Sequence, residues 1–146
     1  MTDKLALVTA QLMHMRASLD RLHRLASIPA EEFLASEDYS ALANHHLQRA
    51  VQAMLDIGRH IVIRRRLGRT SSYADIICRL YENGVLPTDL GERLAELARL
   101  RNRLVHVYWD VTGPDVREVL ETRLEDLEDF MREIVRAIDR ENGPNG

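Results

Sequence analysis

Cysteine and long apolar runs are scarce in this chain of 146 residues; the first shortage excludes an internal disulfide and the second argues against a membrane-spanning helix. Cys78 is the single cysteine, so no internal disulfide can form, and a reducing cytoplasm is the expected compartment. Residues 1–15 lack the charged start and the small-residue cleavage site of a signal peptide, and apolar runs elsewhere stop after a few residues. We therefore expect a cytoplasmic protein without a membrane-spanning helix.

Positive charge is also in short supply, because the formal net charge is −3 at pH 7. This balance excludes the broad basic surface of a generic nucleic-acid-binding protein, so any contact with nucleic acid must be local. Lys4 is the single lysine among 20 basic residues. Arginine favours planar two-point contacts with phosphate or carboxylate, although a codon bias of the genome explains the imbalance equally well.

No stretch alternates apolar and polar residues with a period of two, and the turn dipeptides typical of hairpins are missing, which argues against a β-sheet. Apolar residues instead recur every three or four positions, which predicts an all-α antiparallel bundle of four main helices and a shorter one. Predicted capping or ending residues are Ser27, Ser71 or Ser72, Gly68 and Gly84. The predicted helices cover about Asp3–Ala26, Ser36–Leu67, Ser72–Gly84, Thr88–Tyr108 and Pro114–Ile138, with a short piece near Pro29.

The length of the chain and the lack of linkers predict one domain over residues 1–146, with a tail that frays from about residue 141. Several predicted helices are long and carry a narrow apolar seam. Bundles of this kind often pair with a second copy, so we expect a homodimer.

The stretch RLRNRLVHVYWD, residues 99–110, carries polar side chains where a packed helix needs only leucine. At about 100° per residue, Arg101 falls on the apolar stripe, so its guanidinium requires an anionic or hydrogen-bonding partner. Asn102 and His106 share the adjoining face, and Tyr108 lies near Arg101. Arginine can hold a phosphodiester, and histidine can transfer the proton of a 2′-hydroxyl or of a leaving 5′-oxygen. This group of residues suits phosphate chemistry.

Two structural interpretations compete with a phosphate site. Arg101 could form a salt bridge with an acidic residue such as Asp56 on the second helix, and His106 could be a satisfied interface histidine. In chains this rich in arginine, the Arg-x4-His-x-Tyr spacing also arises by chance in roughly a few cases in a hundred. The spacing alone leaves these alternatives open.

The segment RNRLVHVY resembles the Arg-x4-His-x-Tyr signature of the HEPN superfamily, in particular the HepT-like toxins. The segment HLQRAVQAMLDIGRHIV, residues 46–62, is similar to the second-helix pattern of that family. The segment SYADIICRLYENGVLP, residues 72–87, resembles its Tyr-x-Asp stretch leading into Gly-Val-Leu-Pro. These matches keep the family order over nearly the whole chain.

The resemblance implies a dimeric helical toxin of a type VII-like toxin–antitoxin module that cleaves RNA as a metal-independent endoribonuclease without a cofactor. Arg101 and His106 correspond to the catalytic pair, and Asn102 to the polar position beside the arginine. Tyr108 corresponds to the tyrosine that an MntA-like nucleotidyltransferase antitoxin modifies with AMP to silence the toxin. The alternative is a non-catalytic HEPN bundle that binds a nucleotidyltransferase or a nucleotide.

A basic cluster at the C-terminal end of the second predicted helix has two interpretations. It can offset the helix dipole, or it can contact an RNA backbone or an acidic surface of the antitoxin. The acidic run LETRLEDLEDF on the last helix fits a solvated outer face and is a poor candidate for RNA contact. The residues of the basic cluster are Arg64, Arg65, Arg66 and Arg69.

No HExxH motif or carboxylate cluster completes a ligand set, so no metal site is expected. His14 and His23 are nine residues apart on the first helix, and His45 and His46, being adjacent, should point to different sides of the second. His60 lies in the segment that resembles the family and could face the site.

Overall fold

The computed structural model of the chain describes residues 2–105 and 113–141, with side chains at 6–101 and 113–141. All regular structure in these ranges is helical, which confirms the prediction of an all-α protein. The helices are α1 (Thr2–Ala26), α2 (Ala30–Leu34), α3 (Glu37–Arg64), α4 (Tyr73–Glu82), α5 (Thr88–Val105), α6 (Gly113–Thr122) and α7 (Leu124–Glu141).

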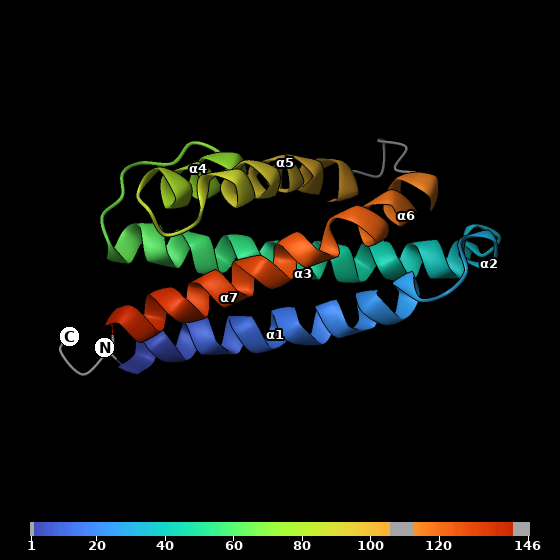
Figure 1. Cartoon of the computed structure of the whole chain (residues 1–146), viewed down its shortest axis with the longest axis horizontal. Coiled ribbons are helices and arrows are strands. Elements are labelled where there is room, and N and C mark those ends of the chain that lie inside the picture. The colour runs from blue at the N-terminus through green and yellow to red at the C-terminus, as the bar shows by residue number, and fades with distance from the viewer. Residues whose placement is uncertain (1, 106–112, 142–146) are drawn as a thin grey trace.

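The two longest helices, α1 and α3, lie antiparallel along each other and define the long axis of the molecule (Figure 1). The α4–α5 hairpin packs on α3 on the side away from α1, while α6 and α7 run back along the bundle to reach α1 (Figure 1). The short α2 closes the end where α1 leads into α3. The predicted antiparallel bundle is therefore confirmed.

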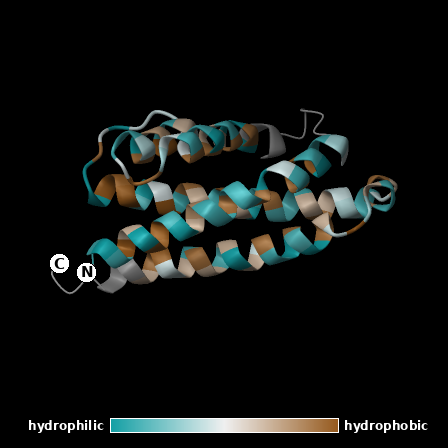
Figure 2. Cartoon of the chain, in the orientation of Figure 1, coloured by the Kyte–Doolittle hydropathy of each residue, from teal (hydrophilic) through white to brown (hydrophobic). Residues whose placement is uncertain are grey.

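The core draws on nearly every helix. Apolar and polar residues share each helix, in the pattern expected when one stripe packs inward (Figure 2). Fully buried members include Met15 on α1, Leu47 on α3, Ile77 on α4, Leu94 on α5 and Phe130 on α7. Among the residues described, no helix is long and apolar enough to span a bilayer.

Serine side chains cap the first turn of two of the helices, and the cap at Ser72 is one that the sequence predicts. The Ser36 hydroxyl accepts a hydrogen bond from the backbone N–H of Tyr39 at 3.2 Å, and the Ser72 hydroxyl accepts one from Asp75 at 3.1 Å. The prediction for Ser27 is wrong. Its hydroxyl donates to the Arg24 carbonyl at 2.6 Å and so serves the end of α1, while Pro29 precedes α2.

The third helix ends earlier than predicted, and Gly68 does not end it. Arg66 adopts the left-handed conformation, with φ of 54°. The N–H of Leu67 then bonds to the Val62 carbonyl at 2.9 Å, and that of Arg66 to Ile63 at 3.3 Å, which is the Schellman pattern. Leu67 packs on the core, and this contact stabilises the turn around a residue less suited to it than glycine. Gly84 does end α4 as predicted, with φ of 77° and the same pattern of bonds.

The predicted fifth helix is two helices, α6 and α7, separated at Arg123. Neither glycine nor proline causes the break. The Thr122 hydroxyl donates to the Glu118 carbonyl at 2.8 Å, a back-bond that tends to bend helices. Arg123 pairs with Glu96 of α5 at 2.9 Å and with Asp126 at 3.7 Å. These tertiary contacts hold the bend in place.

Candidate functional site

Arg101, the predicted catalytic arginine, lies on α5 where this helix meets α3 and α4. Its side chain is half-buried. The guanidinium Nε and Nη2 atoms donate to the Gln52 side-chain oxygen at 3.1 and 2.8 Å. Its Cζ atom lies 4.7 Å from the centroid of the Tyr73 ring, a cation–π contact. The hydrogen-bonding partner that its place on the apolar stripe requires is therefore a glutamine.

The suggested salt bridge between Arg101 and Asp56 is not what the structure contains. Gln52 lies between the two, and its side-chain amide nitrogen donates to the Asp56 carboxylate at 2.9 Å. No carboxylate among the described residues pairs with Arg101, in contrast to most of the arginines on the bundle surface. Its positive charge is held in place without being neutralised by these contacts.

The other predicted catalytic residues lie at the edge of the described structure. The backbone of Asn102 continues α5, but its side chain lies outside the described residues. His106 and Tyr108 also lie outside them. The roles assigned to these three residues stay predictions.

A hollow of about 380 Å³ lies beside the Tyr73 ring, on the side of α4 where the helix begins. Arg59 of α3 and Thr70, Ser71 and Ser72 complete its lining. The Arg59 guanidinium suits a phosphate oxygen, whereas the hydroxyls of Ser71 and Ser72 already bond to Asp75, at 2.7 and 3.1 Å. Sequence reasoning missed Arg59, Gln52 and Tyr73 as site residues, because each becomes a neighbour of Arg101 or of this hollow only through the packing of α3 against α4 and α5.

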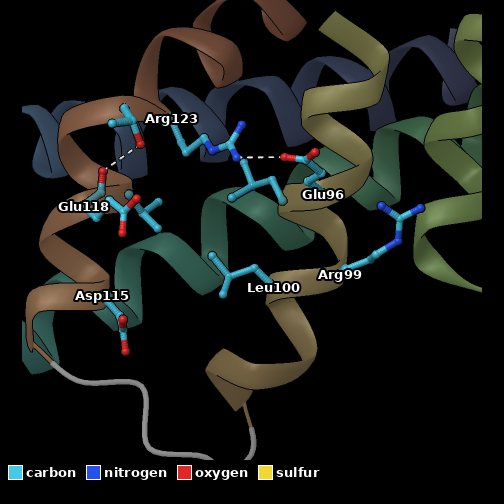
Figure 3. A pocket seen from close by; sticks show the side chains of 9 residues that line it. Glu96, Arg99, Leu100, Asp115, Glu118 and Arg123 are labelled. Carbon is cyan, nitrogen blue, oxygen red and sulfur yellow. Dashed lines mark hydrogen bonds and ion pairs between the residues drawn. The ribbon is translucent and has the colours of Figure 1, made fainter. Parts of the chain in front are cut away.

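A second hollow, of about 340 Å³, separates α5 from α6 (Figure 3). Glu96, Arg99 and Leu100 line it from α5, and Asp115 and Glu118 from α6 (Figure 3). Its three carboxylates would repel a phosphate, and Arg123, the other cation of the lining, is already paired with Glu96. This hollow is therefore a poor site for an RNA backbone.

The basic cluster at the end of α3 divides into two parts. Arg64 and Arg65 both pair with Glu141 of α7, at 3.5 and 3.0 Å. The side chains of Arg66 and Arg69 are exposed. Half of the cluster thus ties α3 to the end of α7, and the contact with RNA or an antitoxin stays a prediction for all four residues.

No histidine among the described residues contacts Arg101. The rings of His45 and His46 meet edge-on with centroids 5.1 Å apart, although His45 is exposed and His46 is half-buried. Burial, followed by the charge of neighbouring His45, lowers the pKa of His46. His60 lines a hollow between α1 and α3 with Leu7 and Gln11. In the described part of the chain, no group of three metal-ligating side chains occurs.

Two proteins that are similar to this chain in sequence are nucleases. The profile of the family described as ribonuclease HepT-like matches residues 15–134. A tRNA nuclease HepT from Aphanizomenon flos-aquae is 28% identical over 116 residues, covering 80% of this chain and 79% of that protein. An mRNA nuclease HepT from Shewanella oneidensis is 33% identical over 92 residues, covering 63% of this chain and 68% of that protein.

Solved structures share the fold. A tri-AMPylated HEPN toxin from Shewanella oneidensis, in complex with an MNT antitoxin, gives a TM-score of 0.81 at 24% identity, over 90% of this chain and 97% of that one. A cytosolic protein of unknown function from Bacillus subtilis gives 0.77 at 19% identity, over 93% and 94%. Because the family profile spans most of the sequence, this chain belongs to the ribonuclease HepT-like family.

Proposed function

We propose that this chain is the toxin of a type VII-like toxin–antitoxin module and acts in the cytoplasm as a metal-independent endoribonuclease. The nuclease activity of its HepT relatives supports the reaction class, and the HEPN toxin–MNT antitoxin complex supports the partner. The observation that carries the proposal is the state of Arg101. Its guanidinium is half-buried and fixed by neutral groups, so its charge is available to a phosphodiester.

The proposed reaction divides the work between Arg101 and His106. Arg101 binds the phosphodiester and stabilises the negative charge that develops on its oxygens. His106 takes the proton of the RNA 2′-hydroxyl, whose oxygen attacks phosphorus while the bond to the 5′-oxygen breaks. The leaving 5′-oxygen must gain a proton. Asn102 orients the imidazole or the phosphate.

One imidazole cannot easily act as base and acid in the same step. A homodimer that brings the α5 helices of two copies together would supply a second His106 to protonate the leaving oxygen. The proposed active unit is therefore a dimer with Arg101 and His106 from both copies in one cleft.

Cleavage of RNA by the purified chain tests this proposal. Arg101→Ala and His106→Ala should each lower the rate by at least about 100-fold, because one removes charge stabilisation and the other proton transfer. A metal chelator should leave the rate of the wild-type protein unchanged.

Arg99→Ala is the matched control, since it removes an exposed arginine of the same helix that lines the α5–α6 hollow instead. Its rate should stay close to that of the wild type. Full activity of His106→Ala would end the assignment. Absence of cleavage in the wild-type protein, with intact binding to a nucleotidyltransferase, would favour the non-catalytic alternative.

Silencing is proposed to occur at Tyr108. Transfer of AMP from the nucleotidyltransferase antitoxin to this phenol would place a bulky anion two residues from His106, where it blocks the cleft and competes for Arg101. The intact mass of the chain should rise by one or more AMP units when it is produced with its antitoxin. This gain should disappear in Tyr108→Phe, and an unchanged mass in the wild-type pair would refute the mechanism.

A further inference from the structure

We infer that Gln52 is a positioning residue for Arg101, and that its lack of charge keeps the guanidinium free to take an RNA phosphate. The inference rests on the proposed function. Gln52 lies near the middle of α3, on the line of contact with α5, and its side-chain oxygen accepts two hydrogen bonds from one guanidinium, at 3.1 and 2.8 Å. Both bonds use the Nε–Nη2 edge, so the Nη1–Nη2 edge is the one that would meet phosphate oxygens.

The orientation of the Gln52 amide is set from its other end. An amide can turn over and exchange its oxygen for its nitrogen, which would point a donor at the guanidinium. Asp56, one turn further along α3, accepts a hydrogen bond from the Gln52 nitrogen at 2.9 Å. Because a carboxylate can only accept, this bond holds the Gln52 oxygen toward Arg101. Asp56 acts on the arginine through the glutamine.

The Tyr73 ring fixes the remaining freedom of the guanidinium. Its centroid lies 4.7 Å from Cζ of Arg101, so the ring limits rotation about the bonds that Gln52 leaves free. Tyr73 also lines the hollow that contains Arg59. Arg101 is therefore held along one edge by the Gln52 amide and through its guanidinium plane by the Tyr73 ring, and both of these groups are neutral.

A carboxylate at position 52 would still accept both hydrogen bonds from Arg101, but it would lose the donor to Asp56 and would compete with the phosphate for the charge of the arginine. Since the ionised Arg101 already makes charge-assisted bonds to the neutral amide, the added effect of the carboxylate is to neutralise the guanidinium. Gln52→Glu keeps the size of the side chain and changes its charge. Gln52→Leu removes the contact altogether.

The experiment measures RNA binding and cleavage in these variants. Gln52→Glu should weaken RNA binding about tenfold or more, measured by fluorescence anisotropy in a His106→Ala background, where the RNA is not cut. In the protein that retains His106, the same substitution should raise KM. Gln52→Leu should lower kcat with a smaller effect on binding, because the arginine keeps its charge and loses its position. Leu42→Glu is the control. It adds the same charge at an exposed position of α3, ten residues before Gln52, and should change binding less than twofold.

A second readout does not depend on RNA. The Nε–H proton of Arg101 should exchange slowly with water in NMR spectra of the wild-type protein, and this protection should disappear in Gln52→Leu. Equal protection in both proteins, or RNA binding by Gln52→Glu at the wild-type level, would overturn the role of Gln52. Loss of protection in Gln52→Leu together with a wild-type protein that binds RNA but does not cut it would refute the ribonuclease proposal alone.

Discussion

Two glycines flanking the turn between α4 and α5 show how closely these helices approach. A Cβ atom added to Gly91 would lie 2.4 Å from the Cβ and Cδ2 atoms of Tyr81, far inside contact distance. Because the Tyr81 Cβ is fixed to its own backbone, this clash cannot be relieved by a change of rotamer. At Gly84, whose φ is 77°, an added Cβ would meet nothing within 4 Å.

Gly91→Ala should lower the free energy of unfolding by about 2–3 kcal/mol, because the methyl group overpacks the α4–α5 contact. Gly84→Ala should lower it by about 1 kcal/mol, the cost of placing alanine in the left-handed conformation. Urea unfolding curves of the two variants give the comparison. Equal losses would mean that the close approach at Gly91 carries no special cost.

The place of Arg101 on the packed side of α5 could be predicted from the helical period alone, and so could its need for a partner. The identity of that partner could not. Which residue of α3 faces Arg101 depends on how deeply α5 settles against α3 and α4, and this depth depends on close contacts such as that of Gly91 with Tyr81. The sequence suggested Asp56, one helical turn away from the residue that makes the contact.

At the scale of helices, an ion pair joins α1 to α7 across the bundle. Arg16 donates two hydrogen bonds to Glu128, and the one from Nη1 is 2.7 Å long. His23 also lies 3.2 Å from this carboxylate. The bonds from Arg16 lower the pKa of Glu128 below its ordinary value, more strongly than burial raises it.

A carboxyl group whose pKa is lower in the folded state adds stability above its unfolded pKa, and this contribution disappears as the pH falls through the folded value. Glu128→Gln should therefore lower the free energy of unfolding by about 1 kcal/mol at pH 7. The difference from the wild type should begin to shrink below about pH 4.3, the ordinary pKa of glutamate, and vanish in stronger acid.

Thermal or urea unfolding at several pH values measures this effect. Glu125→Gln provides the control on the same helix, since Glu125 is exposed and pairs with Arg132 only at 3.4 Å. It should change stability by less than about 0.5 kcal/mol at every pH. A loss for Glu128→Gln that persists unchanged in acid would show that the ion pair is not its cause.

Helices were predictable to within a few residues where local signals mark their ends. Ser36, Ser72 and Gly84 are such signals, since each acts through bonds to its immediate neighbours. The bend at Arg123 was not predictable, because its partner Glu96 lies on another helix. The early end of α3 at Arg66 also depends on tertiary packing, here of Leu67 on the core.

For the molecule as a whole, the proposed active unit is a dimer, and this has a direct test. The purified chain should have about twice its mass of 16.8 kDa in light scattering. Arg101→Ala and His106→Ala homodimers should both be inactive. A heterodimer of the wild type with His106→Ala, purified through two different tags, retains one histidine in the shared cleft and should lose most of its activity, whereas two independent sites would leave about half.

A chain that stays monomeric and still cuts RNA would refute the shared cleft. A heterodimer that keeps about half of the wild-type activity would also count against it, provided that both subunits fold, which the unfolding curves can establish.

Sequence periodicity predicted the bundle but could not identify the proposed reaction, because spacing alone permits a salt bridge as readily as a phosphate site. The family resemblance supplied the reaction, and the contacts of Arg101 support it.

The first turn of α1 and the last turn of α7 lie side by side, at the opposite end of the bundle from the first turn of α6 (Figure 1). This end of the bundle is therefore the one for attachments. A dye, a surface tether or a fused protein joined beside the start of α1 or the end of α7 would lie on that side of the molecule, away from the end of α5. Immobilised molecules would present the α5–α6 end to solution.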